Sequence, residues 1–257
     1  MQHRVLEYDG SWYGLLTLIF EVYEHKYEVS TILNQQRTGM QTDFFAQNAI
    51  VTTNRQKAER VAKGLKAKVG TEGLEELYEA YLSELKGVEM LILKVVQYYF
   101  SVQKASHKNY AHPQLIEIKK IVKSVSRERH RMKAFVRFQL LSDGIYFALV
   151  EPDFNVLPLI VKHFKERYAD QRWVIYDGKR NYGISYDLHE VNEVLFGEEE
   201  ITVNQKSIAV GWHEEEAFYG KLWNLYFKSV NIKERKNTKL HVQHVPKRYW
   251  KYLNEKL

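Results

Sequence analysis

Apolar side chains in the first half of the chain recur at intervals of three and four residues. The first stripe follows Ser11 and is formed by Trp12, Leu15, Leu16, Ile19, Phe20 and Tyr23. This spacing places the side chains on one face of a helix, and the Ser11 hydroxyl is suited to cap its start by accepting a backbone N–H. Short strands are expected at residues 5–8 and 50–52. The rest of residues 26–53 is polar without a clear period and is predicted to be a connection.

Further apolar stripes predict that residues 54–133 are predominantly helical. Asn54 and Thr71 are candidate N-caps of these helices. Pro113 suits the first turn of the last one, because its missing N–H has no intrahelical partner there. This last helix is expected to end near Met132.

Beyond Lys133 the apolar period changes to two. Two strand pairs are predicted around turns that contain glycine, the first at Ser142–Gly144 and the second at Asp177–Gly178. An apolar stripe from Leu157 to Tyr168 predicts a helix between the pairs. The strands themselves are expected at residues 135–141, 145–150, 172–176 and 182–186.

These patterns predict an α+β protein, since helices and strands fall in separate blocks. We expect a helical N-terminal part, an antiparallel sheet with a β-β-α-β-β segment, a C-terminal helix at residues 217–230 and a basic extension. A further strand is predicted at residues 207–210. The 257 residues are expected to form one domain. Within it, residues 1–133 would be mainly helical, and residues 134–257 would hold the sheet and the C-terminal helix.

Composition narrows the chemistry of the chain. It contains no cysteine, which excludes disulfides, thiolate metal ligands and a cysteine nucleophile. We find no signal peptide and no apolar run of the roughly 20 residues that a membrane span requires. A cytoplasmic location without membrane association is therefore expected.

Charge is distributed unevenly along the chain. Residues 54–137 carry 18 basic and nine acidic residues, and residues 138–220 carry seven basic and 15 acidic ones. The last 37 residues carry ten Lys/Arg and two Glu. Two basic blocks therefore flank an acidic one, and the fold could bring the basic blocks together on one face.

The basic C-terminal block is interleaved with aromatic and imidazole rings. Cations pair with phosphates and flat rings stack on bases, so this mixture is typical of a nucleic-acid surface. Tyr249 or Trp250 would stack on an exposed base. The alternative is a lysine cluster that only aids solubility, with Trp250 packed against the core.

The second basic segment is at residues 127–137, where Arg127, His130 and Arg131 share one helix face. They could converge on phosphates, or they could form a solvated helix end whose cations are favoured by the helix dipole. The predicted nucleic-acid contacts of both segments are Arg127, Arg129, His130, Arg131, Lys133, Arg235, Lys236, Lys239, His244, Lys247, Arg248, Tyr249 and Trp250.

Acidic residues and histidines offer a weaker signal for catalysis. Such groups could bind Mg²⁺ or act as acid and base. Asp177, however, is expected in a turn and Asp153 as a helix cap. His241 and His244 lack a third ligand, so no metal site is predicted. The groups considered are Glu151, Asp153, Asp177, Asp187, His163 and His189.

Several enzyme motifs are absent from the sequence. It holds no GxxxxGK[ST], GxGxxG, HExxH or GxSxG pattern. Nucleotide triphosphatases, Rossmann dehydrogenases, zincins and α/β-hydrolases therefore lose their main support. No cofactor is predicted.

The chain resembles a bacterial family of unknown function regarded as a putative DNA metabolism or DNA repair protein. The resemblance runs from end to end of the chain. The segments that carry it are Tyr8–Leu16, His130–Phe138, Glu151–Asp153, His163–Arg167, Trp173–Arg180, Leu222–Phe227 and His244–Trp250.

The resemblance implies a partner protein of the radical S-adenosylmethionine (radical-SAM) class that acts on DNA. Some relatives are fused to a domain like uracil-DNA glycosylase. The iron–sulfur chemistry would belong to the partner. No catalytic residues are carried over from the family.

These observations lead to a DNA-binding accessory or repair factor that acts with a radical-SAM partner. The alternative is an enzyme that acts directly on a damaged or modified base, with acid–base chemistry from His130, His163, Asp153 or Asp177. A third possibility is an interaction module whose basic face meets an acidic protein.

Overall fold

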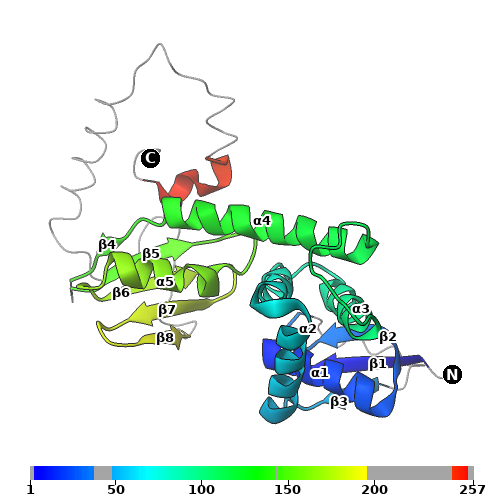
Figure 1. Cartoon of the computed structure of the whole chain (residues 1–257). Helices are drawn as coiled ribbons and strands as arrows, with labels where there is room; N and C mark the ends of the chain where they lie inside the picture. The colour runs from blue at the N-terminus through cyan, green and yellow to red at the C-terminus, as the bar shows by residue number, and fades with distance from the viewer. Residues whose placement is uncertain (1–2, 38–47, 143, 196–244, 254–257) are drawn as a thin grey trace. The chain divides into compact units, whose positions relative to one another are not determined.

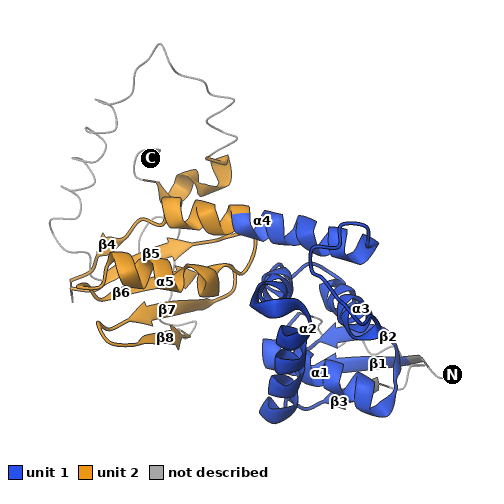
Figure 2. Cartoon of the chain, in the orientation of Figure 1, with its two compact units in different colours: residues 1–126 blue, residues 127–257 orange. Residues whose placement is uncertain are grey.

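The computed structural model describes residues 3–37, 48–142, 144–195 and 245–253 (Figure 1). The chain forms two compact units, residues 1–126 and residues 127–257, and the boundary lies within one helix, α4 (Pro113–Phe135) (Figure 2). Helices dominate the N-terminal half and a sheet dominates the C-terminal half, which confirms the α+β class. The helix predicted at residues 217–230 and the strand at 207–210 lie outside the described residues.

Unit 1 contains a small parallel sheet. Its strands are β1 (His3–Tyr8), β2 (Glu28–Asn34) and β3 (Asn48–Val51), in the order β2-β1-β3. Helix α1 (Trp12–His25) connects β1 to β2, because parallel neighbours require a crossover. Strands β1 and β3 agree with the prediction. Strand β2 does not, because a connection without regular structure was predicted for its residues.

Two helices of unit 1 begin at caps that the sequence predicts. The backbone N–H of Gly14 donates to the Ser11 hydroxyl over 2.9 Å, and the Asn54 side chain caps α2 (Arg55–Tyr81). Gly70 interrupts α2 with a φ of 76°, and the helix continues from the next residue, Thr71. Helix α3 is Val88–Ser101. Among the described residues, no helix combines the length and apolarity needed to cross a bilayer.

A buried polar network joins the strands of unit 1 to α3. The Tyr8 hydroxyl at the end of β1 donates a hydrogen bond to Glu89 over 3.3 Å, and the Asn34 side chain donates one to the same hydroxyl oxygen over 3.2 Å. Arg37 donates to Glu89 over 3.2 Å. Burial, followed by the nearby Glu89 charge, raises the pKa of Tyr8 well above its usual value, so the phenol stays protonated and donates.

Unit 2 holds a mixed five-stranded sheet. The strand order is β4-β5-β6-β7-β8, and α5 (Leu157–Arg167) lies between β5 and β6 in the chain. The strands are β4 (Gln139–Leu140), β5 (Tyr146–Val150), β6 (Trp173–Asp177), β7 (Tyr182–Tyr186) and β8 (Val191–Val194).

The predicted β-β-α-β-β order is confirmed in β4, β5, α5, β6 and β7. The sheet is not antiparallel throughout, however, because β5 and β6 pair in parallel. Helix α5 carries the chain back over the sheet, so both strands start at the same edge. The strand expected at residues 135–141 is shorter, since α4 continues to Phe135.

Aromatic rings pack α5 against the sheet of unit 2. The ring centroid of Phe138 lies 5.7 Å from Phe164 and 5.4 Å from Tyr168, and Trp173 is 1% exposed. Each buried ring removes a large apolar area from water. These contacts join α5 to the start of β6.

Candidate nucleic-acid interface

The C-terminal half of α4 carries the first predicted basic segment. Arg127, His130 and Lys133 are exposed, whereas Arg129 and Arg131 are partly buried. With roughly 100° between successive residues, the three exposed side chains share the solvent face of the helix. This face therefore presents a row of basic side chains.

The second basic segment packs against α4. Its described part forms a short 3-10 helix, η2 (Lys247–Tyr252), drawn in red in Figure 1. The Tyr249 ring lies 5.6 Å from the Phe135 ring, and Tyr249 is only 1% exposed. A buried ring is closed to an incoming base, which corrects the prediction that Tyr249 stacks there.

Glu128 joins the two basic segments. This carboxylate is 1% exposed and lies in the middle of the basic run of α4. Its Oε1 accepts a hydrogen bond from the Tyr249 hydroxyl, 121 residues away in sequence, and another from the backbone N–H of Asp153 over 2.8 Å. Its Oε2 lies 3.4 Å from Arg131 and 3.5 Å from Arg248. A buried charge needs this many donors to offset its desolvation.

Two carboxylates after β5 pair with cations of η2. Asp153 lies 2.5 Å from a guanidinium nitrogen of Arg248, and Glu151 lies 2.7 Å from the Lys251 ammonium. Burial alone would raise the pKa of Glu151, but the bond with Lys251 lowers it below the usual value. The predicted helix-cap role of Asp153 is not seen, since the N-cap of α5 is Val156.

Asp177 is a structural residue at the end of β6. It is fully buried, and its carboxylate accepts from the backbone N–H groups of Lys179 and Arg180 and from the Arg180 guanidinium over 2.8 Å. Burial raises the pKa of Asp177, and the Arg180 charge opposes that rise. The predicted turn role is therefore seen, and the carboxylate has no open path to a substrate.

His163 on α5 lies near the basic face of α4. Its pKa is lowered first by burial and then by the positive charges of Lys133 and Arg167. Lys133 on α4 and Arg167 on α5 are therefore cations on either side of this imidazole. A lowered pKa leaves the imidazole neutral at pH 7.

The other predicted contacts divide into two groups. Lys247 is exposed on η2, and Trp250 is partly buried with its indole N–H donating to the Val245 carbonyl over 3.0 Å. The second group lies outside the described residues and consists of Arg235, Lys236, Lys239 and His244.

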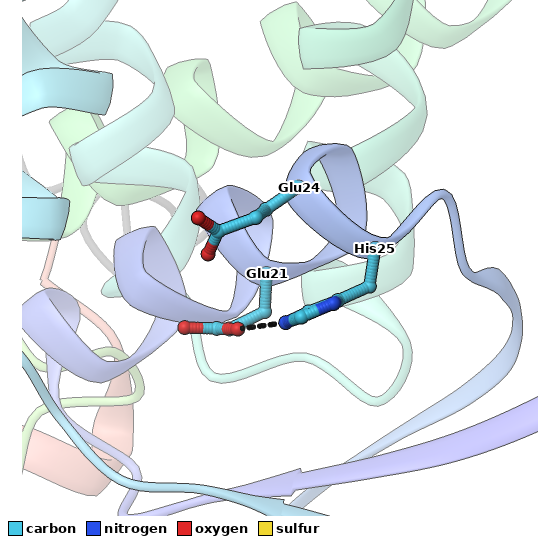
Figure 3. Close-up of side chains that lie close together, drawn as sticks. All are labelled: Glu21, Glu24 and His25. Atoms are coloured by element: carbon cyan, nitrogen blue, oxygen red, sulfur yellow. Dashed lines mark ion pairs between the residues drawn. The ribbon is translucent and has the colours of Figure 1, made fainter.

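Unit 1 holds two groups of carboxylates with a histidine. In the first, Glu21, Glu24 and His25 of α1 lie close together, and His25 pairs with Glu21 over 3.1 Å (Figure 3). The Lys57 ammonium is 2.7 Å from Glu21 and 3.0 Å from Glu24. This lysine supplies the positive charge that a metal ion would otherwise bring.

The second group, Glu72, Glu76 and His107, is arranged in the same way. Lys108 lies 3.3 Å from Glu72, and Lys119 pairs with Glu76. Lysines thus pair with the carboxylates of both groups.

A family model described as "Domain of unknown function (DUF4130)" matches residues 86–255. The chain belongs to this family. The DUF4130 match includes α3, all of α4 and every described element of unit 2, so each predicted nucleic-acid contact lies inside it. No curated protein matches the chain.

Sequence reasoning missed one residue of this DUF4130 region. Glu128 was read only as part of a basic run, although it organises both basic segments. The available signal was a lone carboxylate with arginine on either side of it. Its partners come from distant parts of the chain, so their identity could not be read locally.

Proposed function

We propose that the chain is a DNA-binding accessory or repair factor that works with a radical-SAM partner protein. One observation carries the DNA part of this proposal. Arg131 of α4 and Arg248 of η2 reach the same oxygen of Glu128, so two basic segments that are far apart in sequence meet in unit 2.

Exposed cations surround this meeting point. Arg127 and Lys133 lie on the solvent face of α4, and Lys247 lies exposed on η2. Cations along a surface neutralise successive phosphates and release their counterions. We therefore expect binding that depends on the phosphate backbone and weakens steeply with salt.

The partner and the link to repair rest on the family resemblance. The chain has no cysteine to ligate an iron–sulfur cluster, so that chemistry would come from the partner. Direct catalysis by this chain receives less support, because Asp177 is buried and bound to Arg180.

Fluorescence anisotropy with a labelled oligonucleotide across a salt series tests the DNA part. The variant Arg127→Gln/Lys133→Gln/Lys247→Gln removes three exposed cations from unit 2. A matched control, Lys63→Gln/Lys66→Gln/Lys86→Gln, removes three exposed cations from unit 1.

We expect the first variant to lose affinity and to flatten the salt dependence by roughly 0.9 per lost phosphate contact. The control should bind like the wild type. Absence of wild-type binding, or equal losses in both variants, would overturn the proposal.

A further inference from the structure

Two arginines of unit 2 are held side by side by one buried carboxylate. Arg131 and Arg248 approach the same Oε2 atom of Glu128, at 3.4 and 3.5 Å. Each guanidinium has five N–H donors in a planar fork. Both therefore retain donors that can point to a second anion.

Glu128 is fixed and cannot follow the arginines toward solvent. It is 1% exposed, and its other oxygen is bound by the backbone N–H of Asp153 and by the buried Tyr249 hydroxyl. The arginine side chains are 29% and 42% exposed, so they extend from this anchor to the surface. Glu128 thus acts as a positioning residue for two cations.

An anion already lies on one of these cations. The Asp153 carboxylate is 2.5 Å from Arg248, and its side chain is 48% exposed. Carboxylate and phosphate bind a guanidinium with the same planar geometry. Exposed ion pairs of this kind are weak, so a phosphate can replace the carboxylate.

The backbone of Asp153 stays in place when its side chain leaves. Its N–H donates to Glu128, and its carbonyl oxygen accepts from Lys179 over 3.3 Å and from Arg180 over 3.2 Å. The carboxylate can therefore swing away from Arg248 without loss of these bonds. With it gone, Glu128 and its two arginines carry a net positive charge.

From this arrangement we infer that Arg131 and Arg248 form a twin-arginine site for a backbone phosphate, which Asp153 occupies in the free protein. Asp153 is a built-in competitor that a phosphate of the nucleic acid displaces. This inference rests on the proposed function and names the place where that function is regulated.

The substitution Asp153→Asn tests it, because asparagine keeps the backbone bonds and removes the competing charge. We expect about threefold to tenfold tighter binding of a labelled oligonucleotide, with an unchanged thermal midpoint. Asp170→Asn removes an exposed carboxylate elsewhere in unit 2 and serves as the matched control.

The decisive comparison repeats Asp153→Asn in an Arg248→Gln background. A competitor on Arg248 has no effect once Arg248 is gone, so the gain should vanish. A gain that persists there, or one that Asp170→Asn reproduces, would show a general charge effect and overturn the inference while leaving DNA binding intact. If neither the wild type nor Asp153→Asn binds DNA, the proposed function itself fails.

Discussion

Glu89 in unit 1 and Glu128 in unit 2 are buried carboxylates with the same kinds of partner. Each accepts a hydrogen bond from a buried tyrosine, Tyr8 or Tyr249, and each lies beside at least one arginine. Both tyrosines have a pKa raised mainly by burial, so both remain donors. The local chemistry of the two networks is nearly identical.

The two networks differ in what lies beyond the carboxylate. Glu89 holds one arginine, Arg37, which is 28% exposed and also faces Glu84. Glu128 holds two arginines, and one of them pairs with a surface aspartate. Arg37 thus lies between two carboxylates in unit 1, whereas one carboxylate in unit 2 holds two arginines.

Removal of either carboxylate should give the largest effect on stability. Glu89→Ala and Glu128→Ala each leave a buried tyrosine hydroxyl without its acceptor, and we expect each to lower the free energy of unfolding by about 3 kcal/mol. Urea unfolding measures this loss. Only Glu128→Ala should also weaken DNA binding, since Arg131 and Arg248 lose their anchor; equal weakening by Glu89→Ala would break the distinction.

Tyrosine-to-phenylalanine substitutions should have a smaller effect that differs between the units. Tyr249→Phe removes a bond to Glu128 and is expected to cost about 1 kcal/mol. Tyr8→Phe removes the bond to Glu89 and also the bond that Asn34 donates to the Tyr8 hydroxyl, so we expect about 2 kcal/mol. The same unfolding measurement ranks them, and the reverse order would contradict this account of the two networks.

The smallest expected effect is on the stability of the fold at acidic pH. The contributions of Asp9 and Asp177 to that stability should change in opposite directions as the pH falls. Burial alone would raise the pKa of Asp9, but hydrogen bonds from Thr53 and Ser11 lower it below the usual value. Ionised Asp9 therefore stabilises the folded state above its unfolded pKa of about 3.9. That contribution is lost as the pH falls through the lowered pKa.

Asp177 has a raised pKa, so its contribution declines as the pH rises from about 3.9 through that raised value. The contributions of both aspartates are measured by the thermal midpoints of the wild type, Asp9→Asn and Asp177→Asn between about pH 2 and pH 6. Asp9→Asn should flatten the loss of stability in acid. A steeper loss in that variant would show that the sign is wrong.

The sequence predicted features that depend on local spacing. Ser11 caps α1, Asn54 caps α2 and Pro113 begins α4, because a cap or a first turn involves only neighbouring residues. Strand β2 escaped prediction because most of its side chains are exposed or partly exposed at the edge of the sheet. Such a strand lacks the alternation that marks a half-buried one.

The candidate site was predictable in its charges but not in its connections. The basic segments of α4 and η2 were evident, whereas the burial of Tyr249 was not. Glu128 bonds to residues 25 and 121 positions away. Contacts at such separations depend on the packing of the whole unit, which no local pattern records.

The central claim is that cations anchored by Glu128, unlike the cation anchored by Glu89, bind phosphate. It is tested most directly by the slope of log binding constant against log salt for the wild type, Arg248→Gln and Arg37→Gln. We predict that Arg248→Gln lowers the magnitude of the slope by about one and that Arg37→Gln leaves it unchanged. An unchanged slope in Arg248→Gln, or an equal change in both variants, would contradict the claim.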